Sequence, residues 1–198
     1  MDGQAQNPND DLTPIILAGK QGDRAALTKL IEHFAPSVHR LIYSIVRDSG
    51  LVEDLAQETF VKMLMAFEHY EFRAPFRSWL MRIAVNTCRD HLRKKKVRSI
   101  MSYFKTNEDT DEQQSFVDDA PDPSTVLDKH ERQEILMNAL QKLSETSRMI
   151  LVLRELEQLS YEEIVQILGW KMGTVKSRLF RARQELLEAL LPHREDLI

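Results

Sequence analysis

The sequence contains one cysteine, Cys88, among 198 residues, and it has no long apolar run. A single cysteine cannot build an internal disulfide framework. Without about 18 consecutive apolar residues there is no candidate for a membrane-spanning helix. The six histidines are scattered and do not combine with the cysteine into a set of metal ligands. We therefore expect no zinc site and no other cofactor.

The amino-terminal residues 1–11 are polar and carry three acidic and no basic side chains. Such a segment lacks the features of a secretory signal peptide, and we expect it to be disordered. The sequence therefore predicts a cytoplasmic protein.

Strand patterns are also missing, because no segment alternates apolar and polar residues as a half-buried strand does. Apolar residues instead recur at three- and four-residue steps, which predicts an all-α fold. The spacing favours two small helical domains, residues 12–97 and 129–198. Residues 98–128 have few apolar side chains and no periodicity, so they are expected to form a flexible acidic linker.

The net charge of −4 is unevenly distributed along the chain. Residues 12–97 carry a net charge of +5, residues 98–128 carry −6, and residues 129–198 are balanced. Attraction to phosphate acts within about 10 Å at moderate salt, so local charge matters more than the total. The acidic total therefore does not exclude a nucleic-acid partner.

The segment from Leu159 to Leu187 predicts two helices joined by a tight turn. Ser160 and Glu163 have the spacing of a capping box ahead of an apolar stripe. Gly169 is expected to take the left-handed conformation that ends a helix, and a second helix is expected from about Gly173. This arrangement is typical of a DNA-binding helix-turn-helix.

The second of these helices has an apolar inner face and basic flanks. The inner face consists of Val175, Leu179, Ala182 and Leu186, and the cations are Lys176, Arg178, Arg181 and Arg183. Thr174 and Ser177 lie near its start. A row of cations is most often only a solvated helix face, but here it follows a capped helix and a glycine turn.

The first domain is expected to contain three long helices. Asp23 can cap the first, Pro36 is expected to kink or interrupt it, and Asp48, Ser49 and Gly50 are expected to form the following turn. The second helix should run from about Val52 to Phe67. Its apolar members are Leu55, Phe60, Val61, Leu64 and Met65, and its polar face carries Glu53, Asp54, Gln57 and Glu58.

Those carboxylates allow three interpretations. They could perform acid–base chemistry, favour the helix N-terminus through its dipole, or bind a partner. No nucleophile, metal-ligand set or glycine-rich phosphate loop accompanies them, which disfavours catalysis.

The third helix should run from about Phe76 to Lys96 and ends in a run of cations. Aromatic side chains ahead of a basic helix are typical of single-stranded nucleic-acid binding, although core packing is the favoured interpretation for Trp79. Polar groups step along one face of this helix at helical spacing. They are Asn86, Arg89, Asp90 and Arg93.

Three blocks together resemble an extracytoplasmic-function (ECF) sigma factor of bacterial RNA polymerase, of the envelope-stress type, from about Leu12 to Leu191. The blocks are VEDLAQETFVKML, FRSWLMRIAVNTCRDHLRKKK and LSYEEIVQILGWKMGTVKSRLFRARQEL. The resemblance implies a transcription initiation factor without catalytic activity. Its implied partners are core polymerase (β′ clamp helices and β flap), promoter DNA, and an anti-sigma factor that can be membrane-anchored. No small-molecule substrate is implied.

The resemblance also implies roles for particular residues. The residues that it implies to dock on polymerase are Asp54, Gln57, Glu58 and Phe60. Recognition and melting of the −10 element fall on Asn86, which would read a flipped base, and on Arg89, Arg93 and Lys94. Contact with the −35 element falls on Arg154, Thr174, Lys176, Ser177, Phe180 and Arg181. The acidic linker is expected to thread the polymerase's active-site cleft.

The sequence departs from the family in the turn, where Trp170 is bulky and Met172 replaces a common valine. Cys88 is expected only to pack, with a redox role as the alternative. Two other classes of protein have a C-terminal helix-turn-helix or an α-helical scaffold. A response-regulator-like activator would need an α/β receiver domain, and an enzyme would need a convergent set of titrating residues. The sequence shows neither.

Overall fold

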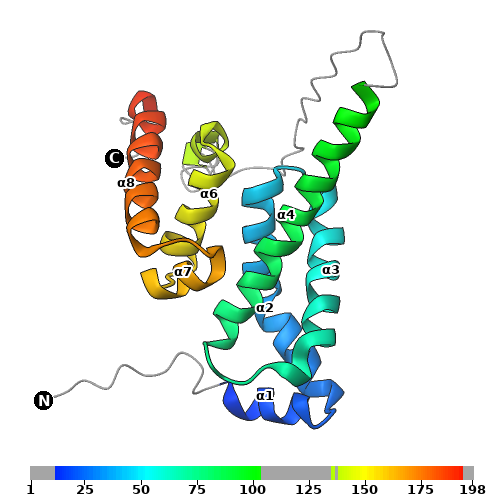
Figure 1. Cartoon of the computed structure of the whole chain (residues 1–198). Coiled ribbons are helices and arrows are strands. Elements are labelled where there is room, and N and C mark those ends of the chain that lie inside the picture. Colours follow the sequence, from blue (N-terminus) through cyan, green and yellow to red (C-terminus); the bar gives the residue numbers. More distant parts are fainter. Residues whose placement is uncertain (1–11, 104–134, 137, 194–198) are drawn as a thin grey trace, which may run out of the picture.

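The computed structural model describes residues 12–103, 135–136 and 138–193. These residues form helices and no strand, arranged as two domains (Figure 1). The N-terminal domain contains α1 (Thr13–Lys20), α2 (Arg24–Val46), α3 (Ser49–Ala66), the 3₁₀ turn η1 (Phe67–His69) and α4 (Phe76–Tyr103). The C-terminal domain contains α6 (Glu145–Leu151), the π-helical turn η2 (Val152–Leu156), α7 (Tyr161–Leu168), α8 (Met172–Leu190) and η3 (Leu191–His193). The all-α prediction is confirmed for the described residues.

Helix α2 begins where the sequence predicts and runs further than expected. The Asp23 carboxylate caps it by accepting hydrogen bonds from the amides of Ala25 (2.8 Å) and Ala26 (3.2 Å). A kink or an interruption was expected at Pro36, and the interruption is wrong, because α2 continues through this residue to Val46. Proline removes one hydrogen bond from the helix, but the apolar stripe on both sides of it is buried, and this packing keeps the helix continuous.

The expected turn at residues 48–50 is the start of α3. The Asp48 carboxylate accepts a hydrogen bond from the Gly50 amide (3.1 Å), and Ser49 and Gly50 already belong to the helix. The reversal of the chain is made one residue earlier by Arg47, whose φ of 56° lies in the left-handed region. The residues that indicate a turn in the sequence therefore form the N-terminal cap of a helix.

An aromatic cluster joins α2, η1 and α4. Phe76 is fully buried, and its ring centroid lies 5.4 Å from those of Phe34 and Trp79. Trp79 is half-buried and packs in the same cluster, as the core interpretation predicts. Helix α4 continues past Lys96 to Tyr103. Residues 98–103, which the sequence assigned to the acidic linker, therefore belong to α4, and residues 104–128 of the predicted linker lie outside the described residues.

The two domains pack against each other. Helix α7 lies against α4, and α6 lies against α2 (Figure 1). Buried side chains of both domains belong to one continuous cluster. We call this packing of the two domains the closed arrangement, because it brings the start of the helix-turn-helix onto the first half of α4.

Candidate nucleic-acid interface

The helix-turn-helix forms as the sequence predicts. The Glu163 amide donates to the Ser160 hydroxyl (3.2 Å), and the Ser160 amide donates to the Glu163 carboxylate (2.8 Å), so the capping box is complete. Gly169 ends α7 with a φ of 69°, and its amide donates to the carbonyl of Val165 (2.9 Å). Only glycine takes this conformation without strain. These two local features fix where α7 begins and where it ends.

Helix α8 buries one face and exposes the other. Val175, Leu179 and Ala182 are buried, as predicted. The predicted −35 residues on the opposite side are exposed, namely Lys176, Ser177, Phe180 and Arg181. Phe180 is notable, since 64% of this aromatic side chain is accessible. Thr174 is half-buried, and its carbonyl accepts from the Ser177 hydroxyl at 3.2 Å. The exposed face offers cations, a hydroxyl and an aromatic ring.

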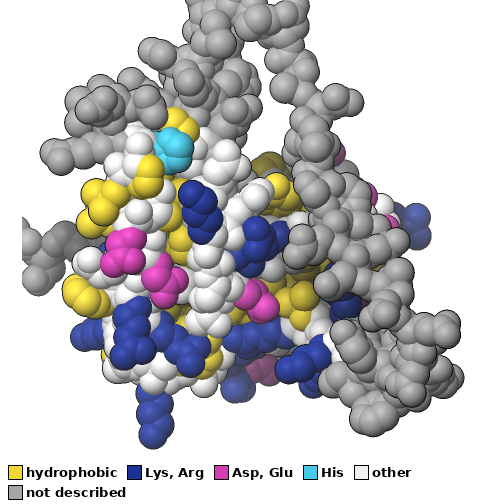
Figure 2. All heavy atoms as spheres, turned by 90° about the horizontal axis from the view of Figure 1, so that it is seen from above, with side chains coloured by type: hydrophobic (Ala, Val, Ile, Leu, Met, Phe, Trp, Pro, Cys, Tyr) yellow, Lys and Arg dark blue, Asp and Glu magenta, His cyan; other side chains and the backbone are white. Residues whose placement is uncertain are grey.

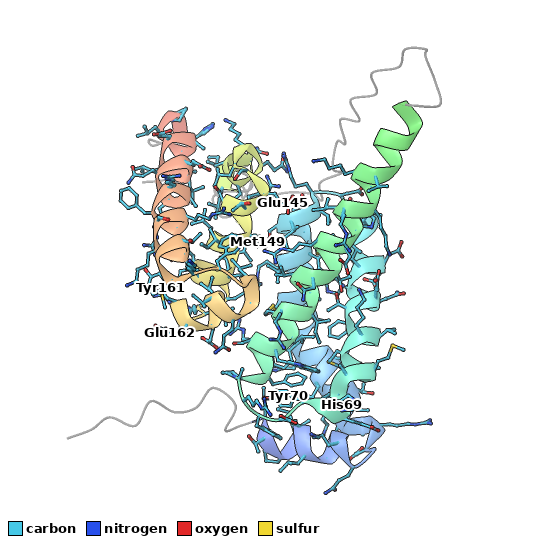
Figure 3. The ribbon with its side chains drawn as sticks, viewed as in Figure 1. His69, Tyr70, Glu145, Met149, Tyr161 and Glu162 are labelled. Atoms are coloured by element: carbon cyan, nitrogen blue, oxygen red, sulfur yellow. The ribbon has the colours of Figure 1, made fainter. Side chains whose placement is uncertain are left out.

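Two cations beside this face are positioned by Tyr161. The guanidinium carbon of Arg154 lies 4.9 Å from the Tyr161 ring centroid, and the Lys176 ammonium lies 6.0 Å from it. Arg154 also donates to the carbonyl of Leu159 (2.7 Å). Cation–π contacts of this kind limit the motion of long side chains. Figure 3 shows Tyr161 at the start of α7, next to α8. No pattern in the sequence predicts this role for Tyr161.

The flank of α8 nearest the turn is held in a similar way. The Arg178 guanidinium lies 4.2 Å from the ring centroid of Trp170. Trp170, whose bulk departs from the family pattern in the turn, therefore packs against a cation. Further along, Arg183 donates two hydrogen bonds to Glu155 (2.6 and 2.9 Å), which raise the pKa of this guanidinium. Glu155 thus balances the charge of Arg183, whereas Arg178 lies against an uncharged ring.

The residues of the predicted polymerase face on α3 differ in exposure. Asp54, Gln57 and Glu58 are exposed, whereas Phe60 is only 8% exposed and belongs to the core. Phe60 is therefore not accessible to a partner in this conformation. Its neighbours Val61 (54% exposed), Leu64 and Met65 (79% exposed) lie on the surface. Helical periodicity placed these three with the buried residues, but no other described element covers that side of α3.

The acidic face of α3 is hydrogen-bonded. Gln57 donates to Glu53 (3.1 Å), and this bond, with a further one from His39, lowers the pKa of the Glu53 carboxyl. Glu58 forms an ion pair with Lys62 one turn later (2.7 Å). Glu53 therefore stays charged at neutral pH. The acidic face lies on the same helix as exposed apolar side chains, and such a surface is suited to a protein partner.

The predicted −10 residues share α4 but differ in accessibility. Asn86, Arg93 and Lys94 are exposed, and Arg93 pairs with Asp90 at 3.0 Å. Arg89 is half-buried, because its guanidinium faces the carbonyl of Leu168 in α7 at 3.5 Å. This burial lowers the pKa of Arg89. In the closed arrangement, the other domain therefore covers one of these four residues.

The contact between the domains contains charges that the sequence did not point out. The Glu157 side chain is 0% exposed, and its carboxylate accepts hydrogen bonds from Arg40 of α2 (2.9 Å) and Arg77 of α4. The Ser78 hydroxyl donates to the Glu163 carboxylate. These partners are 80 or more residues apart in the chain, so no local spacing could reveal them.

A capped helix-turn-helix with an exposed basic face, beside a second domain with a basic helix, defines a DNA-binding transcription factor. Comparisons with known proteins specify the class further. The family model "Sigma-70 region 2" matches residues 30–98, and "Sigma-70, region 4" matches residues 133–186.

Individual relatives extend over most of the chain. It is 34% identical to the RNA polymerase sigma-H factor of Pseudomonas aeruginosa, over 87% of this chain and 90% of that protein. It is 33% identical to the ECF RNA polymerase sigma-E factor of Escherichia coli K12, over 93% of this chain and 97% of that protein. The chain therefore belongs to the sigma-70 family, in its ECF group, and is a transcription initiation factor.

Solved structures have the same fold. A sigma factor RpoE from Bartonella quintana, in complex with the anti-sigma factor NepR, matches with a TM-score of 0.63 and 25% identity. That match covers 82% of this chain and 95% of the other. CnrH, in complex with the cytosolic domain of CnrY, matches with a TM-score of 0.61 and 22% identity over 91% of this chain and 97% of that chain.

Proposed function

We propose that this protein binds core bacterial RNA polymerase, directs it to promoters with −35 and −10 elements, and promotes melting of the −10 region without catalysing a reaction itself. One observation carries this proposal. A single chain that matches both sigma-70 regions presents an exposed recognition helix in one domain and an exposed polar face of α4 in the other.

The C-terminal domain would read the −35 element through α8. The N-terminal part of a recognition helix enters the major groove, where its side chains meet base edges and phosphates. Lys176, Ser177 and Arg181 are exposed on that side of α8. Arg154 and Thr174 lie at its border and would contact the backbone, whereas the Phe180 ring could pack against a thymine methyl group.

The N-terminal domain would act on the −10 element. Taking a base out of the stack costs a few kcal/mol, which must be recovered by contacts with the extruded base. Asn86 can both donate and accept hydrogen bonds on the exposed side of α4. Arg93, Lys94 and, once uncovered, Arg89 would hold the neighbouring phosphates.

Polymerase docking would use the exposed residues Asp54, Gln57 and Glu58 against the β′ clamp helices, and the C-terminal domain would meet the β flap. The apolar residues Val61, Leu64 and Met65 border the acidic face and would extend the contact. Phe60 would support this surface from below. A central apolar area with a charged rim is the usual composition of a protein interface.

We further propose that an anti-sigma factor regulates the protein and that it acts in the cytoplasm. The similarity to a sigma factor solved with an anti-sigma factor supports the first part. Within the described ranges, no helix is long and apolar enough to cross a membrane.

Complex formation with core polymerase tests the proposal. Purified protein and core enzyme are mixed at moderate salt and separated on a native gel. We expect a stable one-to-one complex. A folded protein that forms no complex would favour a helix-turn-helix regulator that acts without docking on polymerase in this way.

A further inference from the structure

The contact between the two domains centres on one buried carboxylate. Both oxygens of Glu157 are engaged, one by Arg40 and the other by Arg77. Taking a carboxylate out of water costs several kcal/mol unless it is paired and hydrogen-bonded. Both partners belong to the N-terminal domain, so the pairing exists only while the domains are in contact.

A second carboxylate of the C-terminal domain meets the same surface. Glu163, which caps α7, accepts a hydrogen bond from the hydroxyl of Ser78, the residue after Arg77 in α4. Figure 3 labels the neighbouring residues Tyr161 and Glu162 at the start of α7. Three donors of one domain thus converge on two carboxylates of the other.

The two carboxylates do not use every hydrogen-bond donor that the N-terminal domain offers at this site. Nε of Arg77 is buried and has no hydrogen-bond partner among the described residues. Arg77 and Ser78 also lie in the first turn of α4, where the helix dipole favours an anion. An anion at this site could therefore accept a hydrogen bond from Nε of Arg77, which Glu157 does not accept.

The proposed function requires the domains to separate. Elements at −35 and −10 lie roughly 25 base pairs apart, which is about 85 Å at 3.4 Å per pair. A domain of about 90 residues has a radius of gyration near 12 Å, so two domains in contact cannot reach both elements. The 31 residues from 104 to 134 can span at most about 105 Å.

Separation would leave Arg40, Arg77 and Ser78 facing solvent, on the same domain as the predicted −10 residues. A guanidinium matches phosphate as well as carboxylate, because both anions present paired oxygens to its planar fork. Arg89, further along α4, is covered in the same way by α7. Figure 2 shows many Lys and Arg side chains along the lower edge of the described surface, and others in its centre and at its right.

We propose that Arg40, Arg77 and Ser78 form an anion site with two alternative occupants. In the closed arrangement, Glu157 and Glu163 of the chain's own C-terminal domain occupy it. After the domains separate, a phosphate of the promoter DNA backbone occupies it. This inference rests on the proposed function, and it makes the C-terminal domain a competitor of DNA for these cations.

The test compares two substitutions at one ion pair, Glu157→Gln and Arg77→Gln, with Arg24→Gln as a control at an exposed arginine outside the site. Two properties are measured. The distance between the domains in the free protein is followed by energy transfer between dyes at the exposed positions Glu68 and Glu188. The lifetime of the promoter complex is measured with core polymerase at several salt concentrations.

Both site variants should lower the energy transfer of the free protein, because each removes the central ion pair. Only Arg77→Gln should shorten the promoter lifetime, by about tenfold, and lower the salt dependence by about one phosphate contact. Glu157→Gln should leave that lifetime unchanged and should speed complex formation, since the competing carboxylate is gone. The control should change neither property.

Three outcomes would overturn the inference. Equal promoter lifetimes for both variants would show that the site only holds the two domains together and does not bind a DNA phosphate. Unchanged energy transfer with Glu157→Gln would show that Glu157 does not hold the closed arrangement. Affinity for core polymerase is measured separately, and a loss specific to Arg77→Gln would assign that arginine to polymerase instead. If wild-type protein gives no promoter complex, it is the proposed function that fails.

Discussion

The Lys176 ammonium and the Arg154 guanidinium lie against the same ring, that of Tyr161, at 6.0 and 4.9 Å from its centroid. One residue comes from the recognition helix and the other from the π-helical turn before it. The ring thus connects two predicted −35 residues that are 22 positions apart in the sequence. Their positions are set before DNA arrives, which lowers the entropy lost on binding.

Replacing both Lys176 and Arg181 with alanine should weaken binding of the holoenzyme to −35 DNA. Two exposed cations are lost, so the logarithmic salt slope should fall by about two. Binding is measured between low and moderate salt, with Arg24→Ala as a control far from α8. An unchanged slope would remove these side chains from the phosphate and base contacts.

Asn86→Ala should impair melting more than duplex binding. The side chain is exposed on α4, and no hydrogen bond within the described structure depends on it in the present conformation, so folding should be preserved. Loss of a base contact worth about 1–3 kcal/mol should reduce the open fraction about tenfold or more. Permanganate reactivity of thymines in the −10 region reports opening. Equal reactivity for variant and wild type would contradict the base-capture role.

Asp54→Ala combined with Glu58→Ala should weaken binding to core polymerase, by about tenfold. The only ion pair lost within the described residues joins Glu58 to Lys62 on the surface, and such pairs add little to stability. Glu32→Ala, at an exposed acid of α2, is the matched control. Affinity is measured by titration of labelled protein. A variant that binds as tightly as wild type would refute the docking assignment.

Cys88 should be inert while the protein is folded. It is fully buried, and burial, with smaller contributions from Glu145 and Glu58, raises the pKa of its thiol to about 12. The thiolate is the reactive form, so a thiol reagent at pH 8 should modify Cys88 only after unfolding. Rapid modification of the native protein would favour the redox alternative.

The same pKa sets the direction of a pH effect on stability. The folded state holds the thiol proton more tightly than the unfolded state, whose cysteine has a pKa near 9. This contribution is fully present below pH 9 and is lost as the pH rises from about 9 to 12. Cys88→Ala should reduce that loss, which can be measured by denaturant unfolding at pH 8 and pH 10.

Local chemistry explains which parts of the fold could be predicted. Ser160, Glu163 and Gly169 act through neighbours within four residues, so their roles can be recognised in the sequence. Asp48 also acts locally, but a cap and a turn use the same residue types, and the sequence could not separate them. Pro36 was misjudged for another reason, since tertiary packing decides whether a helix continues past a proline.

In the candidate site, too, features set by neighbouring residues could be predicted and features set by tertiary packing could not. Periodicity identified α3 as amphipathic, but it could not tell that Phe60 is buried while Val61 and Met65 are exposed, because that depends on which helices cover α3. The ion pair between Arg40 and Glu157 joins residues 117 positions apart. Nothing in either local sequence marks such a partner, so only the folded chain reveals it.

Run-off transcription with purified core polymerase tests the central claim most directly. The template carries a promoter of the ECF type, and a template with altered −35 and −10 elements serves as the control. We predict a transcript of defined length that depends on this protein, on core polymerase and on the intact promoter, with no other activator present. Absence of that transcript, although the protein is folded and bound to polymerase, would contradict the assignment.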